Sequence, residues 1–427
     1  MIDLRRLRQD PDEIRASLAR RKDPSIGALV DRLLDLDRDR RALLVEVESL
    51  KATRNASSEE VARRKQAGES ADDLLGALKA SGERVKELDS SLRLVDEELE
   101  RVALALPNLP DPGVPDGDAS ANRLVRSWGN IPQFKFTARP HWELGQQLDL
   151  LDLPRGAKIA GSGFPLFTGV GAKLVRSLAA FMLDLHTREH GYREISPPYL
   201  VNSASMHGTG QLPKFGEEMY QVASDELYLI PTAEVPLTNM YRDEVLEGDD
   251  LPIGLVAWTP CFRREAGAHG KDTRGLIRVH QFDKVELVRL VRPETSGAEL
   301  SRLTGHAETV LQRLELPYRV LELAAGDTGF ASARTFDLEV WAPGVEAWLE
   351  VSSASTFTDF QARRSSIRYR PARGEKPQFV HTLNASGVAF ARVIAALLET
   401  HQSADGSVRI PAALVPYLGL ERLHPTD

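Results

Sequence analysis

Two apolar heptad patterns in the first quarter of the chain limit its possible folds more than any other feature. Apolar residues recur at alternating steps of three and four over residues 29–50 and again over residues 78–106, with a polar stretch between them. Heptad spacing is typical of coiled-coil helices, and a short break joins two such helices in an antiparallel pair. Residues 28–106 are therefore predicted to form a helical hairpin. Helices of about 35–40 residues are roughly 55 Å long, so the hairpin is expected to leave the globular body as an arm.

The charges of this arm leave two functions open. Between Asp31 and Arg101 the chain carries 14 Lys/Arg against 18 Asp/Glu, so the arm is not a polybasic segment. A rigid rod with local basic clusters can still bind an RNA duplex through its backbone, and a dimerisation or spacer coiled coil is the alternative. The clustered cations are Arg38, Arg40, Arg41, Lys51, Arg54, Arg63, Arg64 and Lys65. The salt-dependent part of RNA binding is expected from Arg38, Arg40, Arg41, Arg63 and Arg64.

Length and composition set the outer limits. The 427 residues allow two or three domains, and no apolar run is long enough for a membrane span. The start of the chain has no apolar signal-peptide core. Cys261 is the only cysteine, which rules out an internal disulfide or a zinc-thiolate cluster and fits a reducing, cytoplasmic location. A net charge of -8 argues against general nucleic-acid affinity, so any such contact must come from local clusters and shape.

A Pro-rich segment divides the chain. The run LPNLPDPGVP at residues 106–115 ends the second heptad helix and marks a domain boundary. We therefore predict an N-terminal domain over residues 1–106, a linker over 107–121 and a main domain over 122–427.

The stretch from Thr259 to Glu286 carries a dense pattern of charged and apolar residues. It reads as strand, turn and strand, and residues 276–282 alternate between apolar and polar side chains. Such a hairpin would place Arg263 and Arg278 on neighbouring strands with Glu265 beside them. Two guanidinium groups aimed at one place suit a polyphosphate, while a surface hairpin with solvated arginines is the alternative. A long mobile turn is marked by Gly267, Gly270 and Gly275.

Arg263-Arg264-Glu265 and the run from Thr273 to Phe282 resemble motif 2 of the class II aminoacyl-tRNA synthetases, and specifically of the seryl-tRNA synthetase family. The resemblance extends over essentially the whole chain. It implies an α+β fold with an N-terminal antiparallel coiled-coil arm and a catalytic aminoacylation domain, at 122–427, built on an antiparallel sheet flanked by helices. It also implies a homodimer, in which the arm reaches across the partner subunit to the long variable stem of serine tRNA.

The resemblance implies an ATP site made from motifs 2 and 3. Residues 346–353 alternate as a strand, on which Glu350 and Ser353 are candidate Mg²⁺ ligands. Residues 384–393 are expected to open a helix that runs to about His401, and its Arg392 resembles the arginine that contacts the γ-phosphate and stacks on adenine. The implied catalytic residues are Arg263, Glu265, Arg278 and Arg392. The implied ATP-binding residues are Arg263, Arg264, Glu265, Val279, Phe282, Glu350, Val351, Ser352, Ser353 and Arg392, with Phe282 on the second face of the base.

A serine site is implied by the Thr232-Ala233-Glu234 segment, which resembles the serine-binding segment of the family. A carboxylate can hold the substrate ammonium and a hydroxyl can orient it, although a helix N-terminus capped by Thr232 also fits these residues. The implied serine-binding residues are Thr232, Ala233, Glu234, Arg263, Glu286, Asn384 and Ser386. A site built to bind the serine hydroxyl is expected to reject alanine without editing.

Residues 174–190 are predicted to form an amphipathic helix and residues 192–198 a strand, and together they resemble the dimer-interface motif 1. His186 and His190 match the H-x-x-E-H zinc pattern. Two histidines one helical turn apart are more often a solvated or interface pair, so we expect magnesium and no zinc. Glycines at 161 and 163 lack the Lys-Ser/Thr of a phosphate-binding loop.

The expected function is that of a serine–tRNA ligase: ATP activates L-serine to seryl-adenylate, and the seryl group passes to the 3′ end of serine tRNA, with selenocysteine tRNA as an open second acceptor. The chain departs from the family at Gly163, Thr356, Phe357 and Ala385, which leaves a specialised paralogue for a biosynthetic pathway as an alternative. Such a paralogue would not need the arm. A non-catalytic RNA-binding scaffold would tolerate losses among Arg263, Glu265, Glu350 and Arg392, which are all present.

Overall fold

The computed structural model describes residues 1–266 and 274–425. The chain divides into two compact units. One contains Ile2–Ala19 and Asp23–Pro107, and the other contains Met1, Arg20–Lys22 and Asn108–Asp427. None of the helices in the described ranges is both long and apolar enough to cross a membrane.

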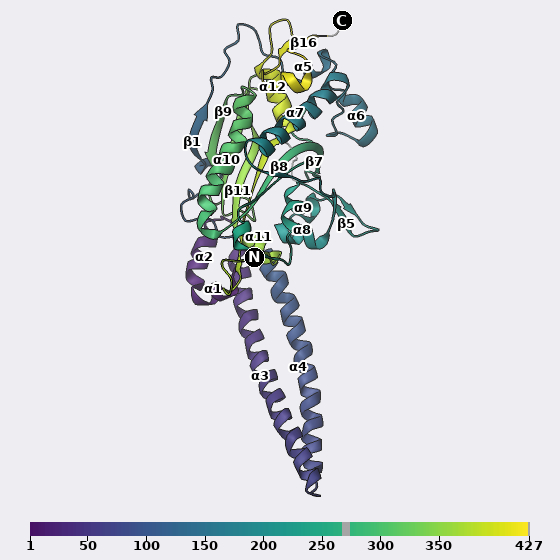
Figure 1. Ribbon diagram of the computed structural model, residues 1–427, viewed down its shortest axis with the longest axis vertical. Helices are drawn as coiled ribbons and strands as arrows, with labels where there is room; N and C mark the ends of the chain where they lie inside the picture. Colours follow the sequence, from purple (N-terminus) through teal and green to yellow (C-terminus); the bar gives the residue numbers. More distant parts are fainter. Residues whose placement is uncertain (267–273, 426–427) are drawn as a thin grey trace. The chain divides into compact units, whose positions relative to one another are not determined.

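The smaller unit is the helical hairpin that the heptads predict. Its helices are α1 (Leu4–Gln9), α2 (Pro11–Ala19), α3 (Ile26–Gln66) and α4 (Asp72–Ala105). Figure 1 shows α3 and α4 side by side over their length. Ion pairs join Arg32 to Glu98 near one end and Lys51 to Asp89 further along, so the two helices run antiparallel. Between them lies a buried apolar seam, which includes Val30, Leu33, Leu36, Val47, Val85, Leu88, Leu99 and Val102.

The larger unit is built on an eight-stranded sheet. Its strand order is β1-β9-β10-β11-β14-β8-β7-β2, and the pairing is antiparallel except between β2 and β7. The strands are β1 (Arg123–Trp128), β2 (Arg193–Glu194), β7 (Ile253–Phe262), β8 (Gln281–Val291), β9 (Tyr318–Glu322), β10 (Arg334–Ala342), β11 (Ala347–Thr358) and β14 (His381–Ala389). This antiparallel sheet confirms the predicted α+β class.

Helices pack on this sheet and close the main apolar core (Figure 1). The α-helices of the unit are α5 (His141–Gln147), α6 (Leu153–Ala160), α7 (Gly169–Arg188), α8 (Ser203–Thr209), α9 (Glu234–Asn239), α10 (Ser296–Arg313), α11 (Phe360–Arg364), α12 (Phe390–Thr400) and α13 (Val415–Leu418). Of these, α7, α10 and α12 supply most of the helical core residues, because each has an apolar face with the 3.6-residue period.

Three small sheets complete the unit. They contain β3 (Leu200–Asn202), β4 (Gln221–Val222) and β5 (Leu227–Leu229); β6 (Val245–Glu247), β12 (Arg368–Arg370) and β13 (Gln378–Phe379); and β15 (Val408–Arg409) with β16 (Arg422–Leu423). Short 3₁₀ turns lie at Ala119–Ala121, Gly216–Glu218, Gly248–Asp250 and Pro293–Thr295.

The second strand of motif 2 is shorter than predicted, because β8 begins only at Gln281. Most of the backbone before it leaves the ladder: the Leu276 N–H donates to the His141 ring, and the His280 N–H donates to the Gly163 carbonyl. The His280 carbonyl still accepts from the Arg263 N–H at 2.9 Å. Leu276 and Val279 are buried but lie three positions apart, so they are loop residues packed into the core and not one face of a strand. Gly275 has φ +71°, as a turn requires, and the predicted turn residues Gly267 and Gly270 lie outside the described residues.

Two further boundaries differ from the sequence prediction. Residues 384–389 belong to strand β14, and the helix α12 starts only at Phe390. The sheet therefore continues through Asn384 and Ser386, because their strand pairs with β8 over this range. The strand predicted at residues 192–198 is limited to Arg193–Glu194, and prolines at 197 and 198 follow it. The helix predicted at 174–190 is α7 (Gly169–Arg188).

Candidate active site

A cleft in the larger unit collects the charged residues of motif 2. Arg263 follows the end of β7, and its guanidinium group lies over the Phe282 ring, 5.2 Å from the centroid. Arg278 lies in the loop before β8 and donates to Glu265 Oε2 at 2.5 Å. The structure thus brings Arg263, Glu265 and Arg278 together, with Arg278 on a loop where the sequence predicted a strand. Other residues of the lining are Leu276, Ile277, Val279, Lys284, Glu350, Val351, Ser386, Ala389, Ala391 and Arg392.

Another part of the cleft lining comes from β11 and α12. Arg392, in the first turn of α12, donates through Nη1 to the Glu350 carbonyl at 2.7 Å and through Nε to the Ile277 carbonyl at 3.1 Å. These bonds hold its guanidinium group at the cleft. Ser352 is buried and donates to the Ser386 carbonyl at 2.6 Å, so its side chain links strands β11 and β14 of the sheet. Arg264 is exposed, and its backbone N–H donates to the Glu218 carbonyl.

Beside this cleft lies a buried cluster of two carboxylates and their hydrogen-bond partners, the carboxylate pocket. Asn384 Nδ2 donates to Glu234 Oε2 at 3.1 Å and to Glu286 Oε1 at 2.9 Å, so one amide bridges the two acids. Gln361 Nε2 donates to the other Glu234 oxygen at 2.5 Å. The Lys284 ammonium lies 2.6 Å from Glu286 Oε2 and donates to Thr232 Oγ1 at 3.0 Å. Ala233 is also fully buried, and Ser386 faces Glu286 in the β14–β8 register.

The electrostatics of this pocket are set by two buried carboxylates and by the Lys284 ammonium that pairs with Glu286. Burial, and then the neighbouring charge of Glu286, raise the pKa of Glu234 to about 7. Burial also raises the pKa of the Cys261 thiol, so this cysteine is poorly reactive at neutral pH.

Sequence reasoning did not assign Lys284 or Gln361 to the pocket. Lys284 lies two residues before Glu286 on β8, and the two-residue period of a strand would have placed both on one face.

A second and larger cavity of about 420 Å³ also borders motif 2. It shares Arg263, Glu265 and Arg278 with the cleft and reaches Thr232 of the carboxylate pocket. Its remaining lining comes from the segment before Thr232, namely Gln211, Phe215, Glu218, Met219 and Pro231. The cavity therefore offers a second approach to the same group of charged residues.

Oxygen donors suited to magnesium lie on two neighbouring strands. Glu350 is exposed on β11, and Ser353 on the same strand pairs with Asp337 on β10. Burial, followed by the charge of Glu350, raises the pKa of Asp337 well above its ordinary value. Its Oδ1 atom is buried without a hydrogen-bond partner among the described residues. Carboxylate and hydroxyl oxygens are the ligands that Mg²⁺ prefers, so these residues fit the ion. Asp337 was missed because only the strand pairing brings it near Glu350.

The histidines of the zinc-like pattern contact each other directly. His186 Nδ1 lies 2.9 Å from His190 Nδ1, and the His306 ring stacks on His190 at 4.0 Å between centroids. Burial, followed by the two neighbouring histidines, lowers the pKa of His186 to about 3. Within residues 1–266 and 274–425, no three His, Cys, Asp or Glu side chains are grouped as metal ligands would be.

The four departures from the family pattern lie among packing residues. Gly163 has φ +82°, and a Cβ there would lie 2.5 Å from the His280 ring, so a larger residue requires His280 to move. Ala385 and Phe357 are buried, and Thr356 Oγ1 contacts Ser296 Oγ at 3.0 Å. None of the four is among the described residues that line the cleft.

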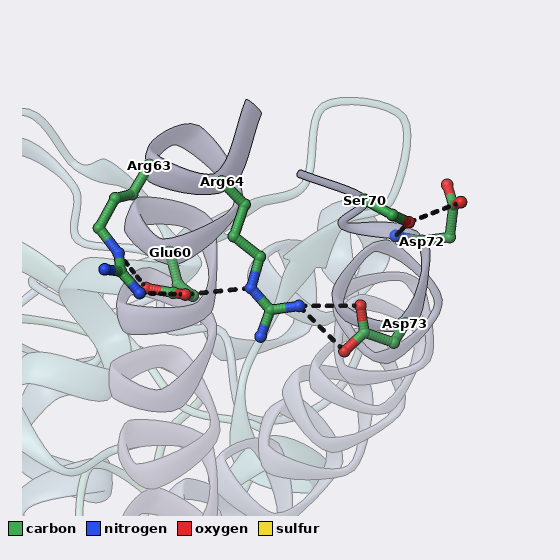
Figure 2. A network of polar contacts seen from close by, with 6 residues as sticks. All are labelled: Glu60, Arg63, Arg64, Ser70, Asp72 and Asp73. Carbon is green, nitrogen blue, oxygen red and sulfur yellow. Dashed lines mark hydrogen bonds and ion pairs between the residues drawn. The ribbon is translucent and has the colours of Figure 1, made fainter. Parts of the chain in front are cut away.

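Most cations of the arm are already paired with carboxylates. Near the turn of the hairpin, Arg63 and Arg64 both donate to Glu60, and Arg64 also reaches Asp73 (Figure 2). These hydrogen bonds lower the pKa of Glu60 to about 2. The other paired cations between residues 31 and 101 are Arg32, Arg38, Arg40, Arg41, Lys51, Arg84, Arg93 and Arg101.

All five arginines from which the sequence predicts the salt dependence of RNA binding are therefore in ion pairs. They are Arg38, Arg40, Arg41, Arg63 and Arg64. The arm is fully described, and within it only Arg54, Lys65, Lys79 and Lys86 are exposed cations without an ion pair. These four belong to the half of the hairpin that contains its turn.

Comparisons with known proteins agree over the whole chain. Residues 1–110 match the seryl-tRNA synthetase N-terminal domain family, and residues 218–401 match the tRNA synthetase class II core domain (G, H, P, S and T) family. The serine–tRNA ligase of Gemmatimonas aurantiaca is 56% identical over 420 residues, which cover 98% of this chain and 99% of that protein. The serine–tRNA ligase of Carboxydothermus hydrogenoformans is 51% identical over 425 residues, covering 99% and 100%.

Solved structures of seryl-tRNA synthetases also match this chain. The crystal structure of seryl-tRNA synthetase from Pyrococcus horikoshii complexed with ATP has a TM-score of 0.95 at 37% identity and covers 100% of both chains. The cytoplasmic serine–tRNA ligase from Naegleria fowleri in complex with AMP has a TM-score of 0.87 at 27% identity, covering 98% of this chain and 97% of that one. The resemblance seen in motif 2 is therefore confirmed: this chain belongs to the seryl-tRNA synthetase family of class II aminoacyl-tRNA synthetases.

Proposed function

We propose that the chain is a serine–tRNA ligase, which activates L-serine with ATP and transfers the seryl group to the 3′ end of serine tRNA. The observation that carries this proposal is a cleft lined by three arginines beside a buried pocket of two carboxylates. A polyphosphate suits the first, and the ammonium group of an amino acid suits the second. Full-length relatives at 56% and 51% identity carry the same activity in their names.

In the first half-reaction, a carboxylate oxygen of serine forms a bond to the α-phosphorus of ATP while the bond to pyrophosphate breaks. We assign Arg263 to the α-phosphate and Arg392 to the departing pyrophosphate, because negative charge shifts between these groups during the step. Guanidinium groups held in place before the reaction stabilise that charge without reorganising. No protein nucleophile is needed, since the two substrates react with each other once they are aligned.

The adenine base is assigned to the motif 2 side of the cleft. Glu265 accepts from the adenine amino group, while Phe282 and Arg392 take the two faces of the ring. Arg278 holds Glu265 through their 2.5 Å contact. The other residues assigned to ATP are Arg264, Val279, Val351 and Ser352, of which the buried Ser352 contributes its backbone.

Magnesium would be held by Glu350 and Ser353 together with ATP phosphate oxygens. When bound, it neutralises phosphate charge. The arginine side chains assigned to the phosphates would align them. We infer no zinc requirement, because the pocket for serine is lined by carboxylates, an amide and hydroxyls.

Serine specificity is assigned to the buried pocket. Glu234, Glu286 and Thr232 bind the substrate ammonium and hydroxyl groups, with Asn384, Ser386, Ala233 and Arg263 completing the lining. Losing the substrate hydroxyl would leave buried polar groups of the pocket without partners, so alanine is discriminated by about 10⁴–10⁵.

In the second half-reaction, a ribose hydroxyl of the terminal adenosine attacks the seryl carbonyl, and AMP leaves. The 420 Å³ cavity beside Thr232 and Arg263 is the approach we assign to this adenosine, because the ATP cleft is then filled by the adenylate. The arm, within a domain at residues 1–106, binds the tRNA, and residues 107–121 link it to the aminoacylation domain at 122–427. We also infer a homodimer with α7 in its interface, and a cytoplasmic location.

Serine-dependent exchange between ATP and pyrophosphate, followed by charging of purified serine tRNA, tests the proposal. Both activities are expected with serine, and neither with alanine or threonine at equal concentration. Exchange supported by another amino acid, or charging of a different tRNA, would refute the proposed substrate.

A further inference from the structure

A buried chain of contacts links α12 to one wall of the cleft. His141, at the start of α5, and Glu399, in the last turn of α12, are both 0% exposed. Glu399 Oε1 accepts from the His141 backbone N–H at 2.8 Å and from His141 Nδ1 at 2.7 Å. Glu399 Oε2 accepts from the backbone N–H groups of Gly344 and Val345 at 2.7 and 3.2 Å. With two N–H donors on each oxygen, the carboxylate acts only as an acceptor.

The second ring nitrogen of His141 meets the cleft wall. The Leu276 backbone N–H donates to His141 Nε2 at 2.9 Å. A backbone N–H cannot accept, so Nε2 carries the lone pair, and Nδ1 carries the proton and donates it in a hydrogen bond to Glu399. Glu399 therefore selects the neutral tautomer of His141 that can hold Leu276.

The held segment forms part of the ATP cleft. Leu276, Ile277, Arg278 and Val279 all line it, and the Ile277 carbonyl accepts from Arg392 Nε at 3.1 Å. Helix α12 thus holds this segment twice, through Arg392 in its first turn and through Glu399 and His141 in its last turn.

Gly275 makes this arrangement possible. It has φ +71°, and a Cβ at this position would lie 2.2 Å from His141 Nε2. Any side chain there would displace the imidazole ring from Leu276.

We propose that His141, oriented by Glu399, is a positioning residue for ATP: it fixes residues 276–279 in the cleft without touching a substrate. The inference rests on the proposed adenylation reaction. Replacing His141 leaves the Leu276 N–H buried without a partner, and the cleft wall shifts to satisfy it. Glu286 and Thr232 of the serine pocket are held by Asn384 and Lys284, so serine binding stays unchanged.

The test compares His141→Ala with wild type in serine-dependent pyrophosphate exchange, with rates expressed per active site after titration of the adenylate formed. We expect kcat/KM for ATP to fall about 10- to 100-fold, since small displacements of positioned groups cost up to about 10²-fold. KM for serine should stay within about twofold, because the hydrogen bonds that hold Glu234, Glu286 and Thr232 do not involve His141. Glu399→Gln should also lower kcat/KM for ATP and leave KM for serine unchanged, but with a smaller effect than His141→Ala. An amide cannot accept hydrogen bonds from all four donors.

The matched control is His401→Ala. His401 is also buried, directly after α12, but its ring contacts the Leu314 carbonyl at 3.0 Å and Arg409. This variant should keep the wild-type kcat/KM for ATP per active site, even if it is less stable.

Wild-type constants per active site in His141→Ala, or equal rises in KM for ATP and serine, would overturn the positioning role. If His141→Ala fails to fold, Gly275→Ala answers the same question, because it displaces the ring while leaving His141 in the chain. A wild-type kcat/KM for ATP in that variant would equally overturn the inference. Absence of serine-dependent exchange in the wild-type protein would instead refute the proposed function.

Discussion

Replacing Arg54, Lys65, Lys79 and Lys86 together with glutamine should remove most of the salt dependence of serine-tRNA binding. These are the exposed cations of the arm that have no carboxylate partner within the arm, which the structure describes throughout. Each phosphate that a free cation neutralises contributes about 0.9 to the slope of log K against log salt on a duplex. Four such contacts give a slope of at most about 3.6, so the wild type loses about 100-fold more affinity than the variant between 50 and 200 mM salt.

The control variant changes the net charge equally but replaces paired arginines. Arg38, Arg63, Arg93 and Arg101 are highly exposed, and each pairs with an acid on its own helix. Replacing them with glutamine leaves the α3–α4 contacts intact. Because their charge is already balanced, the slope should change by less than about 1.

Binding of serine tRNA is measured by fluorescence anisotropy at several KCl concentrations, and pyrophosphate exchange by each variant confirms that the larger unit is intact. Equal flattening of the slope by the two variants would show that ion-paired arginines exchange their carboxylates for phosphates. The distinction between free and paired cations would then be wrong.

Four other outcomes are expected. Arg392→Ala should lower pyrophosphate exchange by about 3–4 kcal/mol of transition-state stabilisation while the protein stays folded, and exchange within threefold of wild type would remove it from the site. Deleting residues 30–103 and joining the ends should leave exchange intact and reduce tRNA charging by orders of magnitude; equal charging would make the arm a spacer. Burial raises the pKa of Glu234 to about 7, so it is mostly protonated below that pH and KM for serine should fall as pH rises through about 7, a dependence that Glu234→Gln should abolish. Exchange should require added magnesium and survive removal of zinc, and stoichiometric zinc essential for activity would contradict this.

The raised pKa of Glu234 also sets the sign of its effect on stability. An acid whose pKa is higher in the folded state than in the unfolded state is less destabilising at low pH than at high pH. The folded state is therefore most stable, as far as this group decides, at a pH that protonates the acid in both states. That contribution is lost as pH rises from about 4.5 to about 7, so Glu234→Gln should be relatively more stable than wild type above neutral pH. Thermal unfolding of both proteins at pH 5 and pH 8 measures the difference.

Local patterns predicted a large share of the fold. The heptad spacing fixed the helical hairpin, because an apolar seam between two helices depends only on residues three and four positions apart. The strand at Ala347–Thr358 was likewise visible in its alternation. Alternation failed at residues 276–280, where the buried residues Leu276 and Val279 are three positions apart and the backbone donates to His141 and Gly163 instead of a neighbouring strand.

The identity of the family was also determined by the sequence, since Arg263, Glu265 and Arg392 occur in motifs with a fixed order. What those residues contact was decided only by the tertiary structure. Glu234 and Gln361 are 127 positions apart, and His141 and Glu399 are 258 apart, yet each pair shares a hydrogen bond. A pKa near 7 for Glu234 and the single tautomer of His141 follow from these neighbours and from burial. Neither can be read along the chain, because chain periodicity reports which face of an element is buried and carries no information about the partner it meets there.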